Sequence, residues 1–255
     1  MINYRHLDEV INAKGLRIVL VQGFPSPWGQ AAKAIFELKG LPCMAAPQSL
    51  GEENAELAVW SGQRNAPVVA WNDEKPIHNW MDILHLAERL SPTPMLIPAD
   101  PMQRALMFGL SREILGEVGV VWNRRLQMLG PAMASGAAPP SVVRMAQSYG
   151  CNARDVELAV PRLVAILNML TAQLKGQYAR GAKYFVGDTL SAVDIYWVTA
   201  MNTVSPLSKE QCPIPDDWRP NFVATDPPIL AALDPLLLQH RDKIFAECFR
   251  NPMEL

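Results

Sequence analysis

The segment SPTPMLIPADP, residues 91–101, divides the chain into two parts with different hydrophobic patterns. It contains four prolines, which lack a backbone donor and disfavour helical backbone before them, so it is expected to be a linker. Before it, short apolar runs alternate with amphipathic stretches, whereas the pattern after it is helical. We therefore predict an N-terminal extension over residues 1–15, an α/β domain over 16–90 and an all-helical domain over 102–255.

The α/β part predicts the element order βαβαββα. The run LRIVLV at 16–21 predicts a strand, and amphipathic spacing over 30–39 predicts the helix that follows it. The next run, LPCMAAP, predicts a strand parallel to the first, because a helix connects the two. The remaining expected elements are a helix over 53–60, a hairpin of APVVAW and PIH around the turn NDEK, and a helix over 80–90.

Helical periodicity predicts the regular elements after the linker. They are a long helix over 102–129, a break at 130–140, helices over 141–149 and 153–179, a helix that starts at Ser191, and a last helix over 228–249. The helix over 153–179 is expected to kink at Pro161. The proline-rich stretch before the last helix predicts irregular structure.

Composition and charge narrow the class of protein. The chain has 255 residues, 49% of them hydrophobic, and a net charge of −2, which gives no electrostatic reason to expect nucleic acid or an anionic membrane as partner. No apolar run reaches the roughly 18 residues that a membrane span needs, and the start MINYRHLDEV is unlike a secretory signal. Its four cysteines are far apart, and His6, His85 and His240 have no partner at metal-ligand spacing, so no metal is expected. These features favour a cytoplasmic protein in a reducing compartment.

The segment YFVGDTLSAVDIYW, residues 184–197, contains a helix start that can be read from chemistry alone. Ser191 can cap the helix, and Asp194, three residues later, can accept a hydrogen bond from the backbone N–H of Ser191. The same segment is similar to a structural motif in the helical domain of glutathione transferases. Together with the order of the two domains, it makes the chain resemble the glutathione transferase superfamily. The resemblance implies a thioredoxin-like N-terminal domain followed by an all-helical C-terminal domain.

The resemblance also implies a role for Ser26, in the loop PSPWG after the first strand. In the family, a Tyr, Ser or Cys in this loop faces the sulfur of glutathione. A hydroxyl there, at the positive end of a helix, favours the thiolate, which is the nucleophile. Trp28 is implied to contribute to the glutathione site beside it. The alternative is that Ser26 only caps the helix.

The stretch NAPVV, residues 65–69, is implied to hold the cysteinyl part of glutathione. In thioredoxin-like domains the corresponding proline is cis, so Pro67 is expected to be cis, with Ala66 and Pro67 at the ligand and the backbone N–H and C=O of Ala66 available to it. Asn65 then stands where the family often places a glutamine that contacts the ligand. Because only about 5–6% of X–Pro bonds are cis, a trans proline that opens an edge strand is the alternative.

The stretch KPIHNWMDIL departs from the family, which usually opens the third helix with Glu-Ser or Gln-Ser. Either His78-Asn79 or Asn79-Trp80 occupies that place. We prefer the first, because Asn79 is a good N-cap and can still donate to a carboxylate. His78 and Asn79 are thus implied as glutathione contacts, but neither register supplies an acidic partner for the amino group of glutathione.

The pocket for the second substrate is implied to lie between the domains, along the long helix. Phe108, Ser111, Arg112 and Trp122 are spaced for one face of that helix, and Arg112 is the polar member that can meet an anionic substrate. The alternative is that apolar residues at this spacing belong to the core.

The resemblance implies a glutathione-dependent transferase that adds the thiolate of glutathione to a small hydrophobic electrophile, with Ser26 stabilising the thiolate. A glutathione-dependent isomerase is one alternative, and a non-catalytic binding or scaffold protein with the same fold is another. Glutathione is the implied co-substrate, and a homodimer is the implied assembly. Nucleic acid and membranes are not expected as partners.

Overall fold

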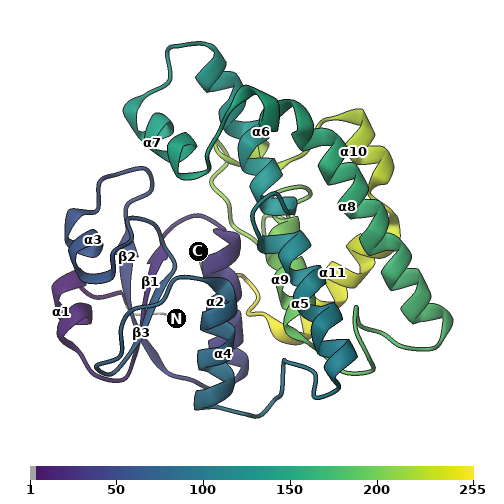
Figure 1. Ribbon diagram of the computed structural model, residues 1–255, viewed down its shortest axis with the longest axis horizontal. Coiled ribbons are helices and arrows are strands. Elements are labelled where there is room, and N and C mark those ends of the chain that lie inside the picture. Colours follow the sequence, from purple (N-terminus) through teal and green to yellow (C-terminus); the bar gives the residue numbers. More distant parts are fainter. Residues whose placement is uncertain (1–3) are drawn as a thin grey trace.

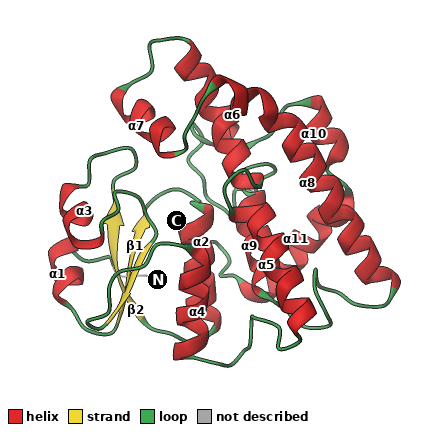
Figure 2. Ribbon diagram, viewed as in Figure 1, coloured by secondary structure: helices red, strands yellow, loops and turns green. Residues whose placement is uncertain are grey.

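The computed structural model describes residues 4–255, which form two units that lie side by side (Figures 1 and 2). The sheet unit contains the strands and α1 to α4, and the helical unit contains α5 to α11. Within residues 4–255, no helix is long and apolar enough to cross a membrane. The elements of the sheet unit are α1 (Leu7–Asn12), β1 (Leu16–Val21), α2 (Pro27–Leu38), β2 (Cys43–Gln48), α3 (Ala55–Ser61), β3 (Val68–Trp71) and α4 (Trp80–Leu90).

β1 is the central strand of a three-stranded sheet with the order β2-β1-β3. It runs parallel to β2, as predicted, and antiparallel to β3. Every residue of β1 is buried because helices cover both faces of the sheet. Ile18 belongs to the core shared with α2 and α4, whereas Val19 packs with Val10 of α1 and Leu57 of α3. Figure 1 shows α1 and α3 on one side of the sheet and α2 and α4 on the other.

The predicted hairpin of APVVAW and PIH is reduced to a single bridge. Val69 and Ile77 exchange two backbone hydrogen bonds of 2.8 Å each, and no further residue of PIH pairs with β3 among the described residues. Pro76 has no backbone N–H to extend the ladder. Three residues after Pro76, Asn79 already begins the cap of α4.

The helical unit agrees with the prediction at several boundaries, including α8, which covers the predicted residues 153–179 with Pro161 inside it. Its elements are α5 (Pro101–Leu115), α6 (Val120–Ala134), α7 (Pro140–Ser148), α8 (Ala153–Ala179), α9 (Ala192–Met201), the 3-10 helix η1 (Arg219–Phe222), α10 (Pro227–Ala232) and α11 (Pro235–Cys248).

The single long helix predicted over 102–129 is wrong, because the chain turns between α5 and α6. Val118 has a positive φ of 59° in this turn. A Cβ on Gly116 would lie 2.6 Å from the carbonyl oxygen of Arg112, so the close approach of the two backbones requires glycine. The apolar periodicity continues through the turn because both helices bury a face in the same core, which hides the break from sequence.

Two further boundaries differ from the prediction. α6 continues past Pro131 to Ala134, so the predicted break begins later. The predicted last helix is divided into α10 and α11 at Asp234, whose carboxylate accepts a 2.9 Å hydrogen bond from the backbone N–H of Leu236. Pro235, at the first position of α11, cannot continue the preceding helix but starts a new one without loss.

The centre of the helical unit is α9, of which every residue is buried. The predicted contact of its capping motif is confirmed, because the carboxylate of Asp194 accepts a 3.0 Å hydrogen bond from the backbone N–H of Ser191. Asp194 also accepts from the backbone N–H of Phe185 at 2.9 Å and lies 2.9 Å from Nε2 of His240. His240 is therefore part of the core, consistent with a structural role.

Polar contacts from α2 join the two units. The indole Nε1 of Trp28 donates a 2.8 Å hydrogen bond to the carbonyl oxygen of Leu115, at the end of α5. At the other end, Lys39 donates to the linker carbonyl of Pro94 at 2.6 Å and pairs with Glu88 at 2.9 Å. The bond of Trp28 holds the start of α2 against the break between α5 and α6, whereas Lys39 ties the end of α2 to the linker and to α4.

Candidate functional site

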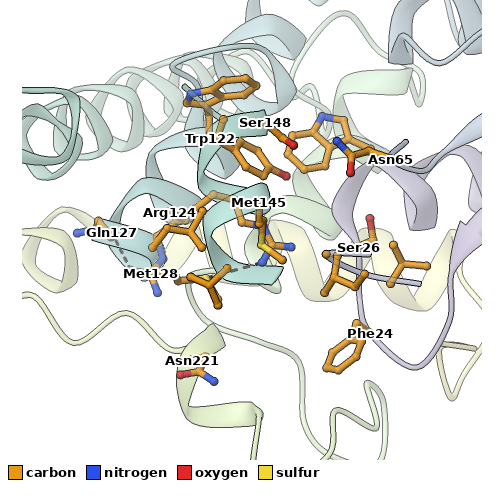
Figure 3. A pocket seen from close by; sticks show the side chains of 18 of the residues that line it. Phe24, Ser26, Asn65, Trp122, Arg124, Gln127, Met128, Met145, Ser148 and Asn221 are labelled. Carbon is orange, nitrogen blue, oxygen red and sulfur yellow. Dashed lines mark hydrogen bonds between the residues drawn. The ribbon is translucent and has the colours of Figure 1, made fainter. Parts of the chain in front are cut away.

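A cleft of about 1260 Å³ lies between the sheet unit and the helical unit. On the sheet side it is lined by the loop from β1 to α2, by the residues before β3 and by the start of α4. On the helical side it is lined by the end of α5, by α6 and α7, and by residues 218–226. Figure 3 shows Ser26, Phe24 and Asn65 on one side of the cleft and Arg124, Gln127 and Met128 on the opposite side.

Ser26 occupies the N-cap position of α2, but its side chain makes no capping hydrogen bond. Its backbone is fixed instead, because its N–H donates to the carbonyl of Phe24 and its carbonyl accepts from the N–H of Gln30, both at 2.8 Å. Pro27 follows as the first residue of the helix, which suits a proline. The interpretation of the hydroxyl as a cap is therefore wrong, and the side chain lines the cleft at the start of α2 (Figure 3).

Trp28 lines the cleft two residues after Ser26, and its indole N–H is already bonded to Leu115. Its ring centre lies 6.1 Å from that of Tyr149, the residue that follows α7. Gly29, the next residue, allows α2 to lie close to β1. A Cβ added at Gly29 would lie 3.0 Å from Cδ2 of Leu20 and 3.6 Å from Oγ of Ser26. Trp28 thus presents an aromatic face to the cleft.

The peptide bond between Ala66 and Pro67 is cis, as predicted. Neither the N–H nor the C=O of Ala66 has a hydrogen-bond partner among residues 4–255. Asn65, which is exposed, and Ala66 both line the cleft. The backbone of Ala66 is therefore free to pair with an extended ligand.

His78 and Asn79 are exposed and line the same cleft near its sheet side. The preferred register is supported by the cap of α4, where Oδ1 of Asn79 accepts a 2.9 Å hydrogen bond from the N–H of Met81. The amide nitrogen of Asn79 remains available to a ligand. Among the described residues, the carboxylates that line the cleft are Glu52, Glu117 and Asp226. None of them lies at the start of α4, where the family usually has Glu-Ser or Gln-Ser.

The structure divides the four residues that were assigned to the second pocket. Arg112 and Trp122 line the cleft. Phe108 lies outside its lining and packs against the ring of His85, with ring centres 5.5 Å apart. Ser111 is fully buried, and its hydroxyl donates a 2.7 Å hydrogen bond to the carbonyl of Met107. Phe108, Ser111 and Arg112 all belong to α5, of which only the last residues, including Arg112, line the cleft, whereas Trp122 reaches it from α6.

Several residues that line the cleft were missed: two lie next to predicted residues but belong to no motif, and the others come from distant parts of the helical unit. They include Phe24 beside Ser26, Arg64 before Asn65, and Arg124, Arg125 and Tyr149 of the helical unit. The adjacent arginines are the longest basic run of the chain, and this was the available signal. Their position in the cleft depends on the turn before α6, which periodicity did not reveal.

The four cysteines are free thiols, and none of them lines the cleft. Burial raises the pKa of Cys43 and of Cys248 to about 11 and that of Cys212 to about 12. Burial also raises the pKa of Cys151, in the turn between α7 and α8. The protein therefore supplies no activated thiol of its own.

At pH 8 we expect native protein to react slowly with a thiol reagent such as dithionitrobenzoate. A pKa of about 11 leaves roughly a thousandth of a thiol ionised at that pH, and the thiolate is the reactive form. Cys151, whose surroundings are the least enclosed, is expected to react first, and all four thiols should react after unfolding in guanidinium. A Cys151→Ser variant should lose the first phase, whereas rapid labelling of Cys43 by peptide mapping would contradict the assignment.

The helical unit matches the family model described as the glutathione S-transferase C-terminal domain, over residues 136–224. No curated protein matches the chain in sequence. Among solved structures, the glutathione S-transferase of Methylobacterium radiotolerans in complex with glutathione sulfonate is 16% identical, with a TM-score of 0.59 and 91% of each chain covered.

Two further solved structures show the same likeness. A glutathione S-transferase of Xanthobacter autotrophicus is 16% identical with a TM-score of 0.60, and 94% of this chain and 98% of that chain are covered. The maleylacetoacetate isomerase of Methylobacterium extorquens, with bound malonate and glutathione, is 15% identical with a TM-score of 0.59, and 90% of this chain and 92% of that chain are covered. The chain therefore has the glutathione transferase fold, and residues 136–224 match the C-terminal domain model of that family.

Proposed function

We propose that the protein is a glutathione-dependent transferase that adds the thiolate of glutathione to a small electrophile. The observation that carries the proposal is the hydroxyl of Ser26, which lines the cleft at the start of α2 without a capping bond. Similar structures with bound glutathione or glutathione sulfonate support the choice of co-substrate.

Glutathione would bind along the sheet side of the cleft. Its cysteinyl backbone would pair with the free N–H and C=O of Ala66, like an added strand. The side chains of Asn65 and Asn79 can hydrogen-bond to the peptide, and the guanidinium of Arg64 can pair with a carboxylate. His78 lies at the same edge and can contribute a further ring nitrogen.

The chemical role of Ser26 would be to stabilise the thiolate. A free thiol has a pKa of about 8.5 and is mostly protonated at neutral pH. A hydroxyl that donates to the sulfur, next to the unpaired amides at the start of α2, lowers the pKa of the bound thiol. The sulfur then forms a bond to the electrophilic carbon, and either a leaving group departs with its electron pair or a conjugated acceptor takes up a proton.

Isomerisation is the second candidate reaction. In it the thiolate adds to an unsaturated substrate, a bond rotates, and the same thiolate leaves, so that glutathione is regenerated. The arginines on the helical side of the cleft favour this candidate, because they suit an unsaturated acid. The similar maleylacetoacetate isomerase structure shows that a protein of this fold can be such an isomerase.

We also propose a homodimer located in the cytoplasm. Met102 and Leu106, one turn apart on α5, are exposed large apolar side chains that a second copy could cover. Four free cysteines suit a reducing compartment.

A calorimetric titration tests whether the cleft accepts glutathione. We expect binding of glutathione and comparable binding of its serine analogue, because the Ala66 backbone and the polar side chains recognise the peptide and not the sulfur. Replacing Asn65 with alanine should weaken both, whereas an exposed asparagine outside the cleft, Asn152, should tolerate alanine without a change in affinity. If millimolar glutathione gives no binding heat at two temperatures, the transferase proposal fails and the fold serves a non-catalytic binding role.

A further inference from the structure

The helical side of the cleft carries positive charge that is concentrated in this place, since the whole chain has a net charge of −2. Among the described residues that line the cleft there are five arginines and three carboxylates. Glu52 is already paired with Arg144 at 3.3 Å, and Asp226 accepts a 3.3 Å hydrogen bond from Gln127. The arginines of α5 and α6 that line the cleft form no ion pair with any residue of the described chain.

Arg124 is the most buried of these arginines, with only 4% of its surface exposed. Its Nε donates to the carbonyl of Thr203 at 2.7 Å, and its Nη1 donates to Oε1 of Gln127 at 2.7 Å. The remaining nitrogen, Nη2, has no hydrogen-bond partner among residues 4–255. Burial lowers the pKa of Arg124, and Asp226 acts in the opposite direction. A buried guanidinium with one free nitrogen, held by two hydrogen bonds, is a prepared partner for an anion.

Arg125, the next residue, also has a guanidinium nitrogen without a hydrogen-bond partner. Its Nε is buried without a hydrogen-bond partner, and its Nη1 donates to the thioether sulfur of Met128, at 3.8 Å. Its guanidinium carbon lies 6.0 Å from the ring centre of Phe222. Burial raises the pKa of the Tyr149 hydroxyl, and an interaction with Arg125 partly opposes this rise. Tyr149 thus stays protonated at neutral pH and adds a hydrogen-bond donor beside Arg125.

Aromatic rings connect this positive group with the Ser26 side of the cleft. The ring of Tyr149 meets that of Trp122 edge-on, with centres 4.9 Å apart, and lies 6.1 Å from the ring of Trp28. Trp28 is two residues from Ser26. A flat, unsaturated substrate can therefore pack against these rings, with its charged end at the arginines and its other end toward the proposed thiolate.

We propose that Arg124, Arg125 and Tyr149 form a binding site for the carboxylate of an aromatic or conjugated substrate. The planar guanidinium of Arg125 and the hydroxyl of Tyr149 would hold the carboxylate oxygens, while Trp122 and Trp28 pack against the body. The identification of this acid as the second substrate rests on the proposed transferase function, whereas its binding does not. The site thus narrows the electrophile from a small hydrophobic molecule to an unsaturated acid.

Calorimetric titration of the full chain with naphthoate and with naphthamide tests this site, because the two probes share a shape and differ in charge. We expect the wild type to bind naphthoate at least about tenfold more tightly, which corresponds to one charge-assisted hydrogen bond. Arg125→Gln should remove most of this preference, and Tyr149→Phe should reduce it. Arg154→Gln, on the exposed surface of α8 and outside the cleft, removes the same charge and should leave the preference unchanged.

Equal binding of the two probes by the wild type would overturn the proposal, as would equal losses in Arg125→Gln and Arg154→Gln. Circular dichroism of each variant verifies its fold, and Arg125→Lys, which keeps the charge, should retain part of the preference. Glutathione is titrated into the same variants. A preference for naphthoate without glutathione binding would support the acid site and remove the transferase, whereas glutathione binding without the preference would remove the acid site alone.

Discussion

Replacing Ser26 with alanine is expected to lower kcat/KM for the conjugation of glutathione to chlorodinitrobenzene by about 10- to 100-fold. The hydroxyl lines the cleft without a capping partner, so its loss removes a donor to the thiolate and little else. A hydrogen bond to a charged group contributes about 1.5–3 kcal/mol, which corresponds to this range of rates. Steady-state kinetics at fixed pH, with the uncatalysed rate subtracted, measures the loss.

Two variants control for the change in shape. Ser26→Thr keeps the hydroxyl and should retain more activity than the alanine variant. Ser148→Ala removes a serine hydroxyl that lines the helical side of the same cleft, where it donates to the carbonyl of Arg144 at 3.0 Å, and should change kcat/KM less than twofold or so. If Ser26→Ala and Ser148→Ala have equal effects, Ser26 has no particular role in the reaction.

Replacing Asp194 with alanine is expected to lower the free energy of unfolding by about 3–5 kcal/mol. The carboxylate is fully buried and accepts hydrogen bonds from the N–H of Phe185 at 2.9 Å and from the N–H and hydroxyl of Ser191 at 3.0 Å. Its other partner is His240, whose ring is also fully buried. Alanine would leave several buried donors without an acceptor at the start of α9, and urea denaturation measures the cost.

Asp188→Ala provides the matched control, because Asp188 belongs to the same segment but is exposed. We expect that variant to remain within about 0.5 kcal/mol of the wild type. If the two variants unfold at the same urea concentration, the buried network does not hold the segment to α9. Because Asp194 is not among the residues that line the cleft, glutathione affinity should fall only where the protein also unfolds.

The sequence was most informative where local chemistry decides the structure. The apolar run of β1, the cap at Asn79 and the contact between Ser191 and Asp194 were all predicted from neighbouring residues. The cis form of Pro67 was different, since residues alone favour trans and only the resemblance to a family predicted it.

The sequence was least informative where tertiary packing decides the structure. The turn at Val118 interrupts no apolar period, so α5 and α6 were predicted as one helix and Trp122 was expected on the same helix face as Arg112. The group of Arg124, Arg125 and Tyr149 combines α6 with the residue that follows α7. A hydrophobic pattern within one element does not reveal such a contact. The sequence also did not reveal that the side chain of Ser26 makes no capping bond, and its contact with a ligand stays a prediction.

The central claim, that Ser26 stabilises a glutathione thiolate, is tested most directly by the ultraviolet absorbance of the thiolate. Wild type and Ser26→Ala are each saturated with glutathione, and the absorbance is followed as the pH is raised. We predict that the pKa of the bound thiol in the wild type lies about 1–2 units below its ordinary value of about 8.5, and that it returns toward that value in Ser26→Ala. The same pKa in both proteins would contradict the account.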